Sequence, residues 1–132
     1  MSPVLRNFLA VLLGAVACIF LNGFLLSAMM KLIGTPAGFD PGDAGTYGLL
    51  EGRYFLSPFI AHAVPSLVGG AIAAWLAATR KMAMALVVGA LHLLGGIAAA
   101  FMVPAPAWFV ALDLAVAYLP MAWLGGRWGA RR

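Results

Sequence analysis

Four long apolar runs, separated by short polar stretches, dominate the pattern of hydrophobic and polar positions along the chain. They cover about residues 4–33, 55–78, 82–103 and 107–128. Each run reaches the roughly 20 apolar residues that a helix needs to cross the hydrocarbon core of a bilayer. None shows the alternation expected of a barrel strand. The pattern therefore predicts an all-α fold, a four-transmembrane-helix antiparallel bundle that forms a single integral membrane domain over residues 1–132.

The connections between these runs are short, with one exception. Residues 34–54 form the only sizeable loop, on the outer side, and their glycine, proline and aspartate content is typical of turns. Asp43 is well placed to cap a short helical segment within this loop. Pro65 and Pro120 lie inside the second and fourth runs, where we expect each proline to kink its helix.

The composition is that of a membrane protein rather than a soluble domain. Of the 132 residues, 64% are hydrophobic and 9% are charged, and the mean hydropathy is +1.02. A soluble domain is roughly half apolar and about a quarter charged. The single cysteine, Cys18, excludes an internal disulfide and a cysteine-rich metal cluster. The net charge of +4 comes from scattered basic residues, so we predict no nucleic-acid partner.

The basic residues are distributed unevenly between the two ends of the predicted bundle. With four spans, Lys31 and Arg53 fall on the side of the long loop, together with three acidic residues. The other six basic residues fall on the opposite side: Arg6, Arg80, Lys81, Arg127, Arg131 and Arg132. Cytoplasmic loops of membrane proteins carry the excess of Lys and Arg. The distribution therefore predicts that the N and C termini are cytoplasmic and that the long loop lies outside.

Asp113 interrupts the fourth apolar run with a carboxylate. A charged group at the centre of a bilayer costs on the order of 2.5–3.5 kcal/mol on insertion scales, so Asp113 should face the bundle interior and have a partner. At about 1.5 Å per residue, Asp113 and His62 lie roughly 9 Å and 10 Å from the outer ends of their helices. His62 is therefore the expected partner. The pair is either ionic or joined by a neutral imidazole N–H, or Asp113 itself carries the proton.

A second layer of polar side chains lies near the predicted midplane. It consists of Asn22, Ser66, His92 and Tyr118. Together with Asp113 and His62, these residues form a predicted intramembrane polar site to which every helix contributes. His62 and Ser66 are four residues apart and share one helix face. The depths of His62 and His92 differ by about 6 Å, so we predict no metal site, and no sequence motif indicates a cofactor.

Three segments of the chain resemble a known group of proteins. They are "SPFIAHAVPSLVGG", "LLGGIAAAF" and "VPAPAWFVALDLAVAYLPMAWLGG", which lie within residues 57–126 and include His62, Asp113 and Pro120. They are similar to a group of small, uncharacterised bacterial four-helix membrane proteins. The resemblance implies a multi-pass protein of the bacterial inner (cytoplasmic) membrane. It implies no activity.

Two kinds of function fit these features. In the first, Asp113 and His62 form a site for a proton or a small solute, with transport in a homo-oligomer because four helices enclose little space. In the second, the protein is a non-catalytic accessory or scaffold protein that docks on a partner membrane protein through Gly/Ala-rich helix faces. One such face carries a small residue at every fourth position: Ser66, Gly70, Ala74 and Ala78. We predict no enzymatic activity, because no nucleophile or cofactor motif accompanies the acid–base pair.

Overall fold

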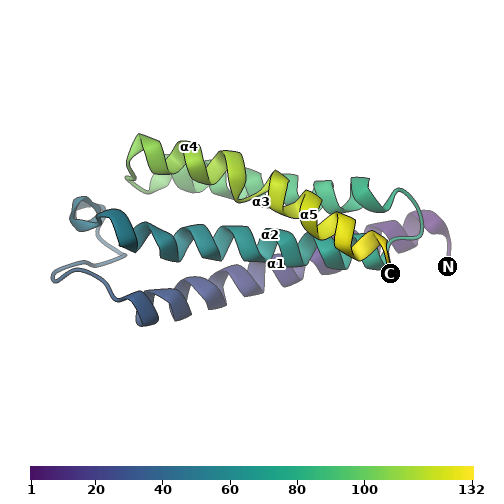
Figure 1. The fold of residues 1–132 in the computed structure, drawn as a ribbon, viewed down its shortest axis with the longest axis horizontal. Coiled ribbons are helices and arrows are strands. Elements are labelled where there is room, and N and C mark those ends of the chain that lie inside the picture. Colours follow the sequence, from purple (N-terminus) through teal and green to yellow (C-terminus); the bar gives the residue numbers. More distant parts are fainter.

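The computed structural model describes residues 1–132 and is built from helices alone (Figure 1). Five α-helices make up most of the chain: α1 (Pro3–Ile33), α2 (Leu56–Leu76), α3 (Lys81–Met102), α4 (Ala107–Val116) and α5 (Leu119–Ala130). Two 3-10 helices lie between α1 and α2: η1 (Ala44–Leu49) and η2 (Gly52–Phe55). Counting η2 with α2, and α4 with α5, four segments are long and apolar enough to cross a membrane. The all-α prediction is confirmed, and no strand is present.

The fourth apolar run forms two helices rather than the single predicted one. α4 ends at Val116 and α5 begins at Leu119, and Tyr118 between them has φ −109° and ψ −82°, outside the helical region. Pro120 lies in the first turn of α5, where its missing N–H needs no partner. In a continuous helix its ring would clash with the carbonyl group of Val116. Pro65, by contrast, lies inside α2, which continues through it.

Helix α2 is the centre of the bundle, and its small residues pack within the chain. It makes its most extensive contacts with α1 and α5. A Cβ atom built on Gly70 would lie 2.6 Å from the carbonyl oxygen of Ala122 on α5. Gly69 and Gly14 meet in the same way, since a Cβ atom on either would lie within 2.7 Å of the other's carbonyl oxygen. Gly70 and Ala74, which belong to the predicted docking face, are therefore buried inside the bundle.

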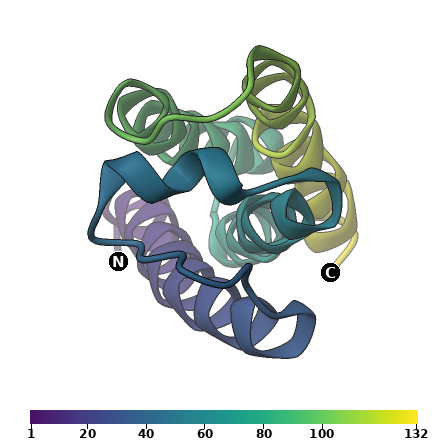
Figure 2. The ribbon, with the colours of Figure 1, turned by 90° about the vertical axis from the view of Figure 1, so that its left-hand side faces the viewer.

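The half of the bundle next to the long loop is less tightly packed. Helix α4 makes few contacts with α2 and α3, and it stands apart from α1 at this end (Figures 1 and 2). The long loop lies over this end, where η1 and η2 cross the end of the bundle (Figure 2). The Asp43 carboxylate accepts a hydrogen bond from the Gly45 backbone N–H at 2.8 Å and so caps η1 as predicted. This capped segment is a short 3-10 helix.

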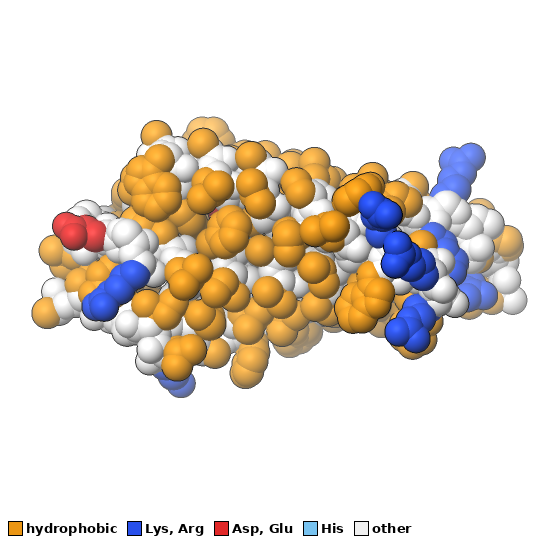
Figure 3. Space-filling model, in the orientation of Figure 1, with side chains coloured by type: hydrophobic (Ala, Val, Ile, Leu, Met, Phe, Trp, Pro, Cys, Tyr) orange, Lys and Arg blue, Asp and Glu red, His pale blue; other side chains and the backbone are white.

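The exterior of the bundle is apolar, and charges gather at its two ends (Figure 3). Only 25 of the 132 residues are buried, and many large apolar side chains are exposed on the helix surfaces. At the end that carries both termini, α1 is tied to the turn between α2 and α3. The Asn7 side-chain oxygen accepts hydrogen bonds from the backbone N–H groups of Ala78 and Thr79, at 2.9 Å and 3.2 Å. This end carries the cluster of Lys and Arg side chains seen in Figure 3.

Candidate functional site

The carboxylate of Asp113 lies inside the bundle and is paired. The Nδ1 atom of His62 is 2.9 Å from both carboxylate oxygens, and the Tyr118 hydroxyl donates to one of them at 3.0 Å. The side chains of His62 and Asp113 are 18% and 7% exposed. An ionised carboxylate only accepts hydrogen bonds, so with Asp113 ionised we assign the proton of this contact to Nδ1. The predicted contact between Asp113 and His62 is thus present.

The break between α4 and α5 brings Tyr118 to Asp113. In a continuous helix, residues five positions apart would point about 140° away from each other around the axis. Because the backbone leaves the helix at Tyr118, its side chain turns back toward the carboxylate. The Tyr118 ring stacks on the His62 ring, with centroids 5.4 Å apart and an interplanar angle of 27°. A Cβ atom at Gly96 would overlap the Tyr118 ring, so glycine at this position makes room for it.

His92 joins the site through Ser66. The Ser66 hydroxyl donates to the carbonyl oxygen of His62 at 2.8 Å, and its oxygen lies 2.9 Å from His92 Nδ1. A serine hydroxyl has one proton, which the carbonyl group occupies, so we assign the proton of this second contact to His92 Nδ1. The Cys18 sulfur lies 3.1 Å from the same nitrogen. In the neutral ring this assignment leaves His92 Nε2 without a proton.

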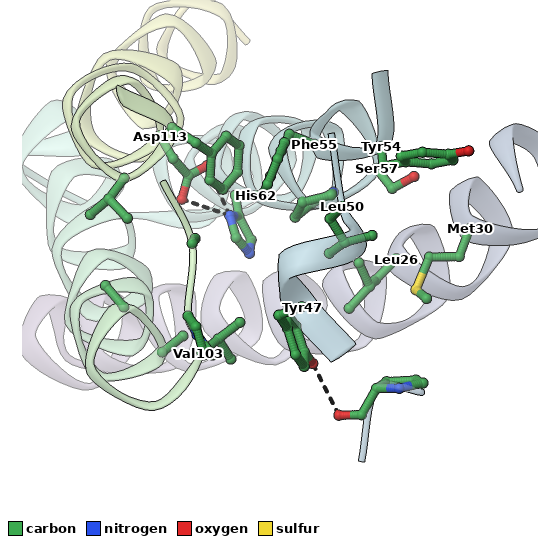
Figure 4. A pocket seen from close by; sticks show the side chains of 18 of the residues that line it. Leu26, Met30, Tyr47, Leu50, Tyr54, Phe55, Ser57, His62, Val103 and Asp113 are labelled. Carbon is green, nitrogen blue, oxygen red and sulfur yellow. Dashed lines mark hydrogen bonds and ion pairs between the residues drawn. The ribbon is translucent and has the colours of Figure 1, made fainter. Parts of the chain in front are cut away.

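Two adjoining cavities flank His62. The outer cavity, of about 250 Å³, lies under the long loop, and the His62–Asp113 pair forms part of its wall (Figure 4). The side cavity, of about 320 Å³, lies between α1 and α3 and is lined by Asn22 and His92 among others. Both cavities are lined by His62, Gly96 and Ala99. The His62 ring therefore stands between them, and its Nε2 atom points away from Asp113 into open space (Figure 4).

The six residues predicted from sequence fall into two groups in the structure. Five of them belong to one hydrogen-bonded network: Asp113, His62, Tyr118, Ser66 and His92. Asn22 stands apart, since its buried side-chain oxygen has no hydrogen-bond partner. These contacts show where the residues lie, and their roles stay predictions.

Sequence reasoning missed two residues of the site. Cys18 lies four residues before Asn22 on the same face of α1, and this spacing was the signal that it faces the interior. Ser57 is 2% exposed and lines the outer cavity. It lies five residues before His62, a spacing that places the two on different faces of α2, so no sequence signal links them.

The fold and the site define a class of protein. It is a helical bundle with four segments able to cross a membrane and with a buried carboxylate–imidazole pair between two cavities. No protein-family model, curated protein sequence or solved structure matches the chain.

Proposed function

We propose that this chain is a multi-pass protein of the bacterial inner membrane, with both termini in the cytoplasm and the long loop outside. Its four spans are α1, α2 with η2, α3, and α4 with α5. The apolar exterior and the confinement of charges to the two ends support this placement (Figure 3). Six of the eight Lys and Arg residues belong to the end with the termini, which the positive-inside rule assigns to the cytoplasm.

Within this placement, we propose that His62 and Asp113 bind and release a proton while a small solute occupies the outer cavity. The observation that carries the proposal is a buried carboxylate bonded to an imidazole whose second nitrogen faces a cavity. With its proton on Nδ1 held by Asp113, the neutral ring presents the lone pair of Nε2 to the cavity. A proton taken up there forms an imidazolium, which the carboxylate 2.9 Å away stabilises.

Transport would need more than the cavities of one bundle. The cavities reach the site from the loop side and from the gap between α1 and α3. Toward the end with the termini, the close contacts of Gly70 with Ala122 and of Gly14 with Gly69 close the interior. Passage to that side therefore requires these helices to separate, or a second copy of the chain to supply the path.

Infrared spectroscopy and liposome measurements test the proton site. As the pH falls, the wild-type protein should gain infrared bands of the His62 imidazolium, and Asp113→Asn should gain them only at lower pH because an amide stabilises the cation less than a carboxylate does. In liposomes under a potassium diffusion potential, the same variant should lose pH-dependent proton flux. Glu51→Gln, which changes an exposed carboxyl group in the loop, is the matched control and should behave as wild type. Unchanged proton binding in folded Asp113→Asn would contradict the proposal.

One observation favours the alternative, an accessory or scaffold protein. Gly95 on α3 is exposed at the side cavity, and a Cβ atom built on it meets nothing within 4 Å. Such a small residue on an exterior helix face lets a partner helix approach closely. If docking is the function, Gly95→Leu should abolish recovery of a complex while Asp113→Asn leaves it intact. If the proton site is the function, Asp113→Asn should change proton binding while Gly95→Leu leaves it unchanged.

A further inference from the structure

The outer cavity has walls that are mostly apolar and aromatic. One aromatic pair, Phe39 and Tyr47, comes from the loop, with ring centroids 5.2 Å apart. A second pair, Phe55 and Phe109, comes from η2 and α4, with centroids 4.8 Å apart and rings inclined by 35°. No Lys or Arg lines the cavity. An anionic solute would lose its hydration here without a compensating charge, so these walls favour an uncharged, ring-shaped solute.

Two polar groups of α2 break the apolar surface. His62 presents Nε2 to the cavity, and Ser57, which is 2% exposed, also lines it (Figure 4). The two residues are separated by about 7.5 Å along the helix axis. A solute that forms hydrogen bonds with both groups is therefore bound more tightly than a solute of the same shape that forms neither. Because the two residues leave α2 on different faces, they border the cavity at different points. A six-membered ring with an oxygen at each of two opposite positions offers one hydrogen-bonding group for each of them.

We propose that the outer cavity binds the ring of a lipid-soluble quinone or of its hydroquinone. This inference rests on the proposed function, because it names the class of solute for the same site. When the His62–Asp113 pair lacks the extra proton, Nε2 accepts a hydrogen bond from a hydroquinone hydroxyl. When the pair holds the proton, Nε2–H donates to a quinone carbonyl oxygen. The Ser57 hydroxyl serves as donor or acceptor for the oxygen at the other side of the ring.

The side cavity gives the apolar tail of such a molecule a way out. It adjoins the outer cavity at His62, Gly96 and Ala99. It is also lined by Ile19 and Leu91, which are exposed on the outer surfaces of α1 and α3. A tail that leaves between these two helices would lie in the acyl-chain region of the proposed membrane. The ring thus stays at His62 while the tail remains in an apolar environment.

Binding is tested with a decyl-substituted benzoquinone, its reduced hydroquinone, and decylbenzene, which has the ring and tail without the oxygens. Quenching of tryptophan fluorescence reports binding, since the Trp108 ring lies 5.5 Å from that of Phe55 on the cavity wall. At least one of the two oxygenated probes should quench saturably, and decylbenzene should fail to compete with it. Ser57→Ala should weaken that binding by about three- to tenfold, as expected for one lost hydrogen bond.

Variants separate this proposal from the proton site. Ser27→Ala removes an exposed serine of α1 outside the cavity and should leave binding unchanged. His62→Leu should weaken binding by at least about tenfold, and Ser57→Ala keeps the test valid if His62→Leu does not fold. Equal competition by decylbenzene, or equal binding by the two serine variants, would overturn the quinone proposal. If the His62 imidazolium bands titrate and no probe binds, the quinone proposal alone fails; if a probe binds and these bands do not titrate, the proton site fails.

Discussion

Replacement of Asp113 and replacement of His62 are expected to have strongly coupled effects on stability. The carboxylate accepts hydrogen bonds from His62 and from Tyr118, and its side chain is 7% exposed. Asp113→Leu therefore leaves an imidazole N–H and a phenol O–H without their acceptor. His62→Leu leaves a buried carboxylate with only the Tyr118 hydroxyl as donor. The double variant removes both halves of the pair.

The size of the coupling follows from the cost of unpaired buried groups. Removing one partner of a buried ionic pair costs about 3–5 kcal/mol, whereas replacing the whole pair by apolar residues of similar volume is often neutral. In the double variant the Tyr118 hydroxyl still lacks an acceptor, so we expect a loss of about 1–3 kcal/mol. The double variant should thus be more stable than at least one of the two single variants. Adding Tyr118→Phe should recover most of the remaining loss.

Unfolding by SDS in mixed micelles, followed by tryptophan fluorescence, measures these free energies. The series consists of the wild type, the two single variants, the double variant and the triple variant. Glu51→Leu is the control, because it removes an exposed carboxylate whose side chain makes no capping hydrogen bond. If the losses of the two single variants simply add in the double variant, the contact between His62 and Asp113 contributes no coupling energy, and the argument for a paired buried acid is refuted.

Three further predictions use the same unfolding assay or proteolysis. Gly125→Ala should lower the free energy of unfolding by about 1–3 kcal/mol, because its Cβ atom would overlap the Leu67 carbonyl oxygen. Gly95→Ala, where the added atom meets nothing, should cause no such decrease. Equal effects of the two variants would contradict the close packing of α5 against α2. Asn22→Leu should raise the free energy of unfolding by about 1 kcal/mol, because it removes an unpaired buried oxygen. A clear decrease in the free energy of unfolding would show that this oxygen is bonded. Asn7→Ala should speed tryptic cleavage in the turn between α2 and α3, since two backbone N–H groups lose their acceptor; an unchanged rate would refute this role.

The helices and the acid–base contact could be predicted from the sequence because each depends on a strong local signal. Long apolar runs bounded by charged or proline-rich turns leave little freedom in where α1, α2 and α3 begin and end. The contact between His62 and Asp113 followed from similar depth and from the cost of an unpaired carboxylate in an apolar helix. Neither prediction depends on how the helices pack.

The different effects of the two prolines could not be predicted, because they depend on packing. Pro65 and Pro120 both interrupt apolar runs, yet only the second separates two helices. α2 packs between α1 and α5, so a break at Pro65 would open contacts on two sides. α4 has few neighbours to hold it in line with α5, so the break at Pro120 costs little packing. The contact of Tyr118 with Asp113 depends on this break, and the residue spacing alone would place them on different faces.

The same break explains why the site lies where it does. Beyond it, α5 packs against α2 so closely that Gly125 and Gly129 touch the backbone of the neighbouring helix, which leaves no room for a paired acid. Before it, α4 stands off from the bundle and leaves the outer cavity open. Asp113 lies in the last turn of α4, at the boundary between the open and the closed half. There a buried carboxylate has both a partner on α2 and a cavity beside it, which is the arrangement that the proposed proton site uses.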